Sequence, residues 1–222
     1  MWTSKEGDVR REEFLKTAFE LFLEKGYEKT SINDIIKKIG VTKGAFYYYF
    51  KSKDEILNVL CMEQAEHFLN IVQQISADGK LSALDKINQI ITNVFRYRAA
   101  QMENRLKFLK LLENEGNLKL AGRINEYILL YGSPVIRSII EQGIHEGTFV
   151  TEFPAEAAEL YIQLSNIMNN VITKLLMNTQ NRSEAEAAIK KKTLFYEETF
   201  EKLLGIKKGC IHLSDTILQY YF

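Results

Sequence analysis

Hydrophobic positions recur every three or four residues along the chain, and this spacing predicts helices throughout. Phe14, Ala18 and Phe22 share one helical face near the N-terminus. A second stripe runs from Ile32 to Ile39 and stops at Gly40, a residue typical of helix ends. No stretch alternates with the period of two that a strand requires, and the 222 residues include only two prolines. The sequence therefore predicts an all-α fold with about nine helices.

Polar residues that can cap helix N-termini mark where several of these helices begin. Ser52 with Glu55 forms a capping box, and Thr42 can cap the short helix before it. Ser183 with Glu186 predicts the start of a last long helix in the same way. Further helices are expected after Ser82, over about 104–113, from about Leu118 to near Gly147, and from Pro154.

Charge is unevenly distributed in a chain that is neutral overall. Lys and Arg number 29, as do Asp and Glu, and 46% of residues are hydrophobic, so the composition is that of a folded globular protein. The segment from Lys25 to Lys53, however, carries seven basic and two acidic residues. Such a local excess is the electrostatic footprint of a phosphate-binding surface, although a solvated helical face has the same composition.

The sequence lacks the features that identify several classes of protein. Two cysteines make no disulfide framework, and the longest uncharged run, Leu160 to Thr173, has 14 residues where a membrane span needs about 20. Met1 to Asp8 carries no apolar core of a secretion signal. No Gly-rich phosphate loop, nucleophile elbow or paired-Cys metal motif occurs. We therefore expect a cytoplasmic protein that is not an enzyme, with no metal, no cofactor and no membrane partner.

The clearest chemical signal lies between residues 31 and 50. Two short helices joined by a tight glycine-containing turn predict a helix-turn-helix, whose second helix enters the DNA major groove. On that helix Phe46 and Phe50 are four apart and can face a core together, so the tyrosines at 47–49 cannot all be buried. Gly44 and Ala45 are small enough to let the helix approach base edges.

The stretch FLKTAFELFLEKGYEKTSINDIIKKIGVTKGAFYYYFKSKDEIL resembles the N-terminal domain of the tetracycline-repressor (TetR) family. The matching elements are LF, EKGY, TS, DI, GVTKG, YYYF and KSK, in the family's order and spacing. The family consists of helical homodimeric transcription factors, mostly repressors. The resemblance implies a DNA-binding domain over 8–68, with the helix-turn-helix at about 31–50, and an effector-binding and dimerisation domain over 69–222. The helix that begins after Ser52 is shared between the two domains.

At matching positions the resemblance implies a set of DNA contacts. Gly44 and Ala45 are expected at the bases, and Lys43 at a phosphate or a guanine. Tyr47, Tyr48 and Lys53 are expected at the phosphate backbone, whereas Tyr49 stands where the family often has His. The full set of expected contacts is Thr30, Ser31, Thr42, Lys43, Gly44, Ala45, Tyr47, Tyr48, Tyr49 and Lys53.

The C-terminal half carries weaker signals for a dimer surface and a ligand pocket. The helix after Pro154 and the one after Ser183 are apolar on broad faces, so they can pair with a second copy of the chain, or else bury one internal core. A pocket is expected between the helices that run from the one after Ser52 to the one that begins at Pro154, because aromatic residues and a few polar ones gather there. Its candidate lining residues are Phe68, Phe95, Arg98, Met102, Phe108, Tyr127, Tyr131, Tyr161, Asn166 and Asn170.

These observations favour a ligand-responsive dimeric regulator, most often a repressor that a small molecule releases from a palindromic operator. The alternatives are an activator of the same fold and a small-molecule binding protein without a DNA function. The partners expected are double-stranded operator DNA, a second copy of the chain and an effector of unknown identity. The apolar tail over 205–222 has no function assigned by the sequence.

Overall fold

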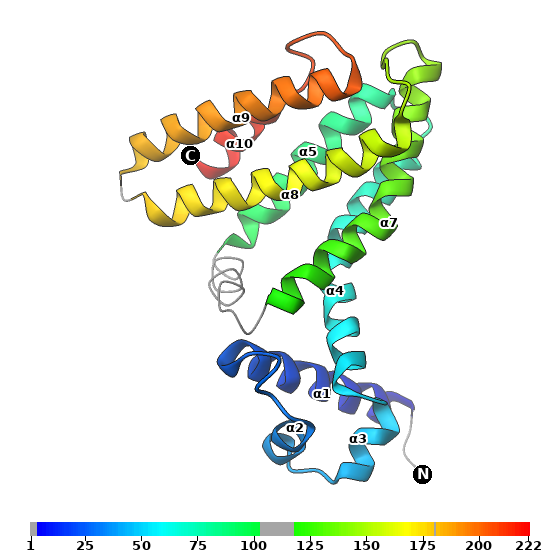
Figure 1. Ribbon diagram of the computed structural model, residues 1–222, viewed down its shortest axis with the longest axis vertical. Coiled ribbons are helices and arrows are strands. Elements are labelled where there is room, and N and C mark those ends of the chain that lie inside the picture. Colours follow the sequence, from blue (N-terminus) through cyan, green and yellow to red (C-terminus); the bar gives the residue numbers. More distant parts are fainter. Residues whose placement is uncertain (1–3, 103–117, 180) are drawn as a thin grey trace. The chain divides into compact units, whose positions relative to one another are not determined.

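The structure is a computed structural model that describes residues 4–102, 118–179 and 181–222. Over those ranges it contains helices and no strand, which confirms the all-α prediction. The helices are α1 (Ser4–Lys25), α2 (Ile32–Ile39), α3 (Lys43–Tyr49), α4 (Lys53–Ser76), α5 (Ala83–Ala100), α7 (Leu118–His145), α8 (Pro154–Asn178), α9 (Arg182–Leu204) and α10 (Leu213–Tyr221) (Figure 1). None of these described helices has the length and apolar content to cross a membrane. The helix expected over about 104–113 lies outside the described residues.

The chain divides into two compact units. The first contains the residues up to Glu66 together with α7 as far as Tyr127. The second contains α4 from His67, α5, α7 from Ile128, and α8 to α10. Helices α4 and α7 therefore each contribute residues to both units.

Local hydrogen bonds define the short helices of the first unit. Ser31 Oγ accepts the backbone N–H of Asp34 at 3.1 Å, and Asp34 Oδ2 accepts the backbone N–H of Ser31 at 2.7 Å, which makes a complete capping box before α2. Gly40 ends α2 with φ at 78°, a left-handed conformation that glycine adopts without a Cβ clash. Thr42 Oγ1 accepts the N–H of Ala45 at 3.3 Å and begins α3.

Four phenylalanines form the centre of the first unit. Phe14 and Phe22 of α1, Phe46 of α3 and Phe50 after it are fully or almost fully buried. The rings of Phe14 and Phe46 meet edge to face with centroids 5.7 Å apart, a favourable aromatic geometry that fixes α3 against α1. Cys61 of α4 is buried beside them, and this burial raises the pKa of its thiol to about 12, so it packs as a small apolar side chain.

In the second unit the long helices α8 and α9 lie side by side (Figure 1). The expected capping box of Ser183 and Glu186 is wrong, because α9 begins at Arg182, two residues before the start that a cap at Ser183 requires. Asn181 is its N-cap, and Asn181 Oδ1 accepts the N–H groups of Ser183 at 3.0 Å and Glu184 at 3.5 Å. An Asn at this position satisfies the same free donors that a Ser would.

The C-terminal tail is held by a buried carboxylate of α9. Glu201 is 3% exposed, and its Oε1 accepts the backbone N–H groups of Gly209, Cys210 and Ile211 at 2.6, 2.9 and 3.2 Å. A charged acceptor with several N–H donors makes stronger hydrogen bonds than a neutral one. Glu201 therefore fixes the turn that leads from α9 into α10.

The tail then continues as α10, which packs on α5 and α9. Glu197 Oε1 accepts the N–H of Ser214 at 2.6 Å in the first turn of α10, where a negative charge is favoured. At the other end, the rings of Tyr221 and Phe95 meet edge to face at 6.3 Å. The helix thus supports α5 from outside, and its apolar residues are explained by this packing.

Removal of the buried carboxylate is expected to destabilise the protein. Glu201→Ala leaves three buried or half-buried N–H groups without their acceptor, at a cost of about 3 kcal/mol in unfolding free energy. Urea titration followed by circular dichroism measures this loss. Glu198→Ala on the same helix removes only a surface pair with Lys208 and should leave the unfolding midpoint unchanged. Equal midpoints for parent and Glu201→Ala would contradict the role given to Glu201.

Candidate nucleic-acid interface and ligand pocket

The exposed face of α3 carries polar and aromatic side chains together. Tyr48 is 82% exposed and Tyr47 49% exposed, although both follow the buried Phe46. Lys43 is exposed in the first turn, with its Nζ 6.0 Å from the centre of the Tyr47 ring. Tyrosine hydroxyls and lysine ammoniums are common donors to phosphate oxygens, so this face has the composition of a nucleic-acid surface.

The same helix presents little side-chain bulk at its start. Gly44 is exposed, and a Cβ built there would meet only Thr42 Oγ1, at 3.8 Å. Ala45 is half-buried, and Thr42 is exposed while its hydroxyl caps the helix. The backbone of α3 can therefore come close to another surface at this point, as base readout in a major groove requires.

Two lysines of the basic segment are paired with carboxylates inside the first unit. Lys25 Nζ lies 2.9 Å from Asp34 Oδ2, and Lys38 Nζ lies 3.2 Å from carboxylate oxygens of both Glu20 and Glu24. The Lys25 ammonium and the Ser31 hydroxyl hold the pKa of Asp34 well below its usual range. These pairs connect α1 with α2, and the positive charge of both lysines is partly neutralised.

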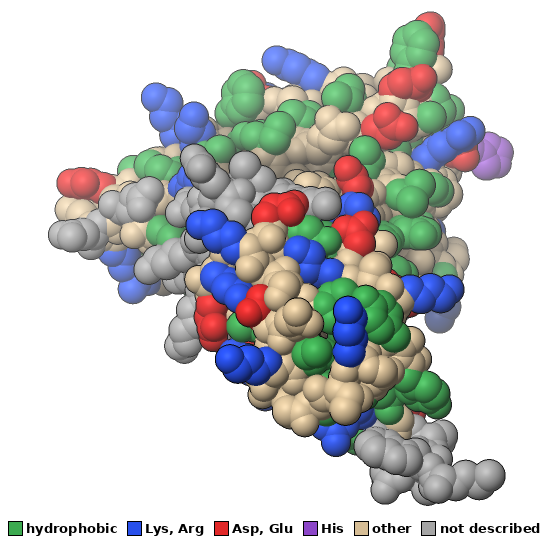
Figure 2. Space-filling model, turned by 60° about the horizontal axis from the view of Figure 1, so that its bottom comes forward, with side chains coloured by type: hydrophobic (Ala, Val, Ile, Leu, Met, Phe, Trp, Pro, Cys, Tyr) green, Lys and Arg blue, Asp and Glu red, His purple; other side chains and the backbone are tan. Residues whose placement is uncertain are grey.

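Four other lysines stay exposed around α2 and α3. Lys29, Lys37, Lys43 and Lys51 form no ion pair with any acidic residue in the described part of the chain. Figure 2, which brings the unit with α2 and α3 forward, shows blue Lys and Arg side chains spread over this face. Only Lys43 was expected as a contact by motif position, whereas the local charge excess pointed to all four.

Thr30 and Lys53 both make internal hydrogen bonds in the structure, and the phosphate contacts expected of them stay predictions. Thr30 is 1% exposed, and its hydroxyl donates to the Gly26 carbonyl at 2.8 Å. Lys53 Nζ donates to the carbonyls of Tyr27 at 2.8 Å and Thr30 at 2.9 Å, and it lies 4.1 Å from the Tyr27 ring centre. Both side chains thus bind the turn between α1 and α2 rather than facing outward.

Tyr49 and Ser31 are also engaged within the protein. Tyr49 is half-buried with its ring 5.7 Å from Phe14, so it covers the edge of the aromatic core. The Ser31 hydroxyl is exposed, but it donates to Asp34 Oδ2 at 2.7 Å as part of the α2 cap. The structure therefore leaves Lys43, Tyr47 and Tyr48 as the most accessible of the expected contacts with long side chains.

Beside Lys53, Asp54 joins α7 to the same turn. The Tyr27 hydroxyl donates to Asp54 Oδ1 at 2.7 Å, and Arg123 Nη2 of α7 lies 3.4 Å from Asp54 Oδ2. Arg123 Nη1 also donates to the side-chain oxygen of Asn58. Burial and the hydrogen bond to Asp54 raise the pKa of Tyr27, so it stays protonated and keeps donating. No sequence motif signals this contact, since Arg123 lies 65 and 69 residues from its partners Asn58 and Asp54.

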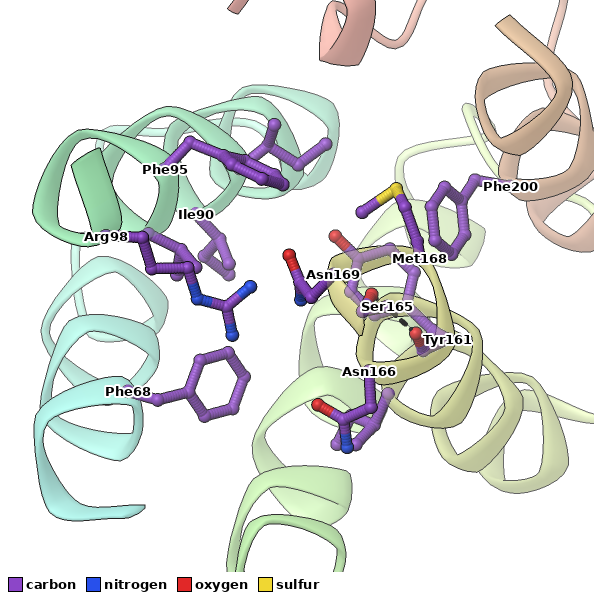
Figure 3. Close-up of a pocket in the computed structure, with 13 residues that line it drawn as sticks. Phe68, Ile90, Phe95, Arg98, Tyr161, Ser165, Asn166, Met168, Asn169 and Phe200 are labelled. Carbon is purple, nitrogen blue, oxygen red and sulfur yellow. Dashed lines mark hydrogen bonds between the residues drawn. The ribbon is translucent and has the colours of Figure 1, made fainter. Parts of the chain in front are cut away.

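A narrow pocket lies within the second unit (Figure 3). Its walls come from α4, α5, α8 and α9, and the lining residues are Phe68, Ile90, Ile91, Val94, Phe95, Arg98, Tyr161, Ile162, Ser165, Asn166, Met168, Asn169 and Phe200. The space open inside it is about 30 Å³, far less than the hundreds of Å³ typical of small-molecule sites. A larger ligand must therefore push the walls apart.

The pocket contains half of the residues expected there. Phe68, Phe95, Arg98, Tyr161 and Asn166 line it. Outside it, Asn170 and Tyr131 are exposed, Met102 is half-buried without lining it, and Tyr127 packs against the core of the first unit, while Phe108 lies outside the described residues. Effector binding by the lining residues stays a prediction.

Asn169 is one of the pocket residues that the sequence did not mark. It lies three residues after Asn166 on α8, whereas Asn170, four after Asn166, faces outward. Asn169 is 6% exposed, and its Oδ1 has no hydrogen-bond partner among the described residues. Its neighbour Thr173 donates to the backbone carbonyl of Asn169 at 2.7 Å and so does not reach this oxygen. A buried acceptor of this kind is unusual and indicates a polar end of the pocket.

No three His, Cys, Asp or Glu side chains come together to hold a metal ion in the described ranges. Among the described residues, the pocket lining contains none of these four residue types. The polar groups present are amides, two hydroxyls and a guanidinium, which suit an organic ligand better than a metal.

Comparison with known proteins gives the family. Residues 14–60 match the family model described as bacterial regulatory proteins, tetR family. Over 169 residues, or 76% of this chain, the sequence is 27% identical to the fatty acid metabolism regulator protein of Bacillus subtilis (strain 168), covering 84% of that protein. The chain belongs to the TetR family.

Further relatives agree with this assignment. The probable acrEF/envCD operon repressor of Escherichia coli (strain K12) is 22% identical over 180 residues, which are 79% of this chain and 80% of that one. The crystal structure of the transcriptional regulator FadR from Bacillus subtilis in complex with stearoyl-CoA shares the fold, with a TM-score of 0.55 and 24% identity over 90% of this chain and 98% of that one. This TetR-family protein is a DNA-binding transcriptional regulator.

The internal contacts of Lys53 predict an effect on stability without DNA. Lys53→Ala removes two hydrogen bonds from a charged donor and leaves the carbonyls of Tyr27 and Thr30 short of a partner, at a cost of about 1–3 kcal/mol in unfolding free energy. Thermal unfolding of the free protein measures this loss. Lys43→Ala, at an exposed lysine, is the matched control and should unfold at the parent's temperature. If both variants unfolded at the parent's temperature, the internal contacts of Lys53 would not stabilise the protein. Its side chain would then be available for the expected phosphate contact.

Proposed function

We propose that this TetR-family protein is a dimeric repressor whose α3 reads operator DNA and whose affinity for the operator falls when a small molecule occupies the second unit. The observation that carries the DNA part is the exposed face of α3, where Tyr47, Tyr48 and Lys43 stay accessible above a buried phenylalanine core. Large exposed aromatics on a short helix are a liability unless a partner covers them.

The proposed contacts divide by kind. Gly44 and Ala45 let α3 approach the base edges in a major groove, while the hydroxyls of Tyr47 and Tyr48 bind phosphates. The exposed lysines supply the sequence-independent attraction to the phosphate backbone. Ser31 and Thr42 lie at the N-termini of α2 and α3, and the DNA contacts expected of them remain part of this proposal.

The proposed dimer forms through α8 and α9. Leu160 and Ile167 of α8 are about half exposed and lie seven residues apart, hence on one helical face. Leu194 and Phe195 of α9 are exposed as well, at 46% and 63%. A second copy would bury these apolar side chains in a four-helix arrangement, and two α3 helices would then meet the two halves of a palindromic site.

The proposed release by a ligand follows from the continuity of α4. Its first residues, Lys53 and Asp54, hold the turn before α2, and Phe68 further along lines the pocket. A ligand that widens the pocket acts on Phe68 and so favours another position of the helix. A coupling of about 1–3 kcal/mol would lower operator affinity by about 5–150-fold.

The DNA contact is tested with an operator selected from random duplexes by the purified protein. Lys43→Ala and Tyr48→Ala are each expected to weaken binding by about 5–30-fold, since each loses one charged or polar contact. Lys43→Ala should also flatten the slope of log affinity against log salt by about one, if it contacts phosphate. Lys207→Ala, an exposed lysine of the second unit, is the control. Unchanged binding by both α3 variants would move the interface elsewhere.

The dimer contact is tested by placing charge in the apolar surface. Ile167→Glu and Phe195→Glu are expected to raise the dimer dissociation constant by about a hundredfold or more, because a buried carboxylate would lack a partner. Sedimentation velocity measures the association state. Leu130→Glu, at an exposed apolar residue of α7, should sediment like the parent. Dimers that persist in both α8 and α9 variants would rule out this interface.

A further inference from the structure

The polar end of the pocket combines a cation and a buried acceptor. Figure 3 shows Arg98 of α5 and Asn169 of α8 pointing toward one another across the pocket. Arg98 is the only charged residue among the described lining residues, and its Cζ lies 5.9 Å from the centre of the Phe95 ring. Asn169 Oδ1 is buried and accepts no hydrogen bond from the described residues. This end of the pocket therefore has a positive charge on one side and a buried hydrogen-bond acceptor on the other.

Most of the remaining lining is apolar, although Tyr161, Ser165 and Asn166 add polar atoms to it. Its apolar members include Phe68, Ile91, Val94 and Ile162. Met168 adds an unbranched side chain that can change rotamer as a ligand enters. Such walls stabilise a hydrocarbon or aromatic group by removing it from water, at about 25 cal/mol per Å².

We infer that the effector is an apolar monocarboxylate that carries an N–H or O–H donor next to its carboxylate. The carboxylate pairs with the Arg98 guanidinium, whose parallel N–H groups match its two oxygens. The adjacent donor satisfies Asn169 Oδ1, and the apolar part fills the space that opens between α4, α5 and α8. A plain fatty acid fulfils only the first and third of these requirements, because its ionised carboxylate has no donor.

This inference rests on the proposed effector site and deepens it. Both polar requirements can be separated in one series of small probes with the same chain. N-octanoylglycine has the carboxylate and the amide N–H; N-octanoyl-N-methylglycine lacks the N–H; the methyl ester of N-octanoylglycine lacks the charge. Their dissociation constants are measured by isothermal titration calorimetry on the full-length protein, below any micelle-forming concentration.

The parent protein should bind N-octanoylglycine about tenfold more tightly than either analogue, the equivalent of one buried hydrogen bond or more. In Asn169→Leu the preference for the N–H should disappear while the preference for the carboxylate remains. In Arg98→Met the opposite should hold. Thermal unfolding of both variants checks that they are folded, and the ratio between two probes on one variant does not depend on small changes in stability.

Two results would overturn the inference. One is no measurable binding of N-octanoylglycine to the parent, and the other is probe ratios that stay the same in both variants. Operator binding is measured separately in the presence of each probe. If the ratios follow the expected pattern but operator affinity does not fall, the ligand chemistry stands and the proposed release is wrong. If another compound releases the operator equally from parent and both variants, the proposed function stands and this inference is wrong.

Discussion

The ammonium group of Lys53 is the contact on which the DNA-binding unit depends. It binds two carbonyls in the turn between α1 and α2, those of Tyr27 and Thr30. Lys53 is also the first residue of α4, which follows α3. Its side chain therefore links the chain just before α2 to the chain just after α3. Thr30 reinforces the turn with its own buried hydroxyl, which donates to Gly26. A charge in a partly buried place is tolerated here because it has specific acceptors and a tyrosine ring beside it.

Asp54 extends this arrangement to α7. Its two carboxylate oxygens are shared between the Tyr27 hydroxyl and the Arg123 guanidinium, so adjacent residues of α4 bind both the turn and a second long helix. Since α4 and α7 each continue from the first unit into the second, the proposed switch needs no flexible linker. The proposed switch would act through α4 and α7, whose early residues Asp54 and Arg123 contact one another. Further along α4, Phe68 lines the pocket.

Local features of the sequence predicted the fold better than the site. The cap at Thr42 and the stop at Gly40 depend on residues three or four positions apart, and the structure has them as expected. The role of Lys53 depends on carbonyls 23 and 26 residues away, which no local pattern marks. Asn169 was missed because a change of one residue rotates a helical position by about 100°, and the pattern alone did not fix which Asn faces inward. The helix in the tail depends on Glu201 and Glu197, whose burial only the packed structure reveals.

The charge excess of the first unit acquires a different meaning once the contacts are known. Lys25 and Lys38 are paired with carboxylates, and Lys53 donates to a carbonyl in the turn before α2. Much of the positive charge between Lys25 and Lys53 therefore stabilises the arrangement of the helices. The part that can attract a phosphate backbone comes from the lysines that stay exposed around α2 and α3. Counterion release scales with the number of phosphates neutralised, so a surface with few free cations gains limited affinity from charge alone. In the proposed complex, close approach of α3 through Gly44, and the tyrosine hydroxyls beside it, would then supply much of the binding and the sequence preference.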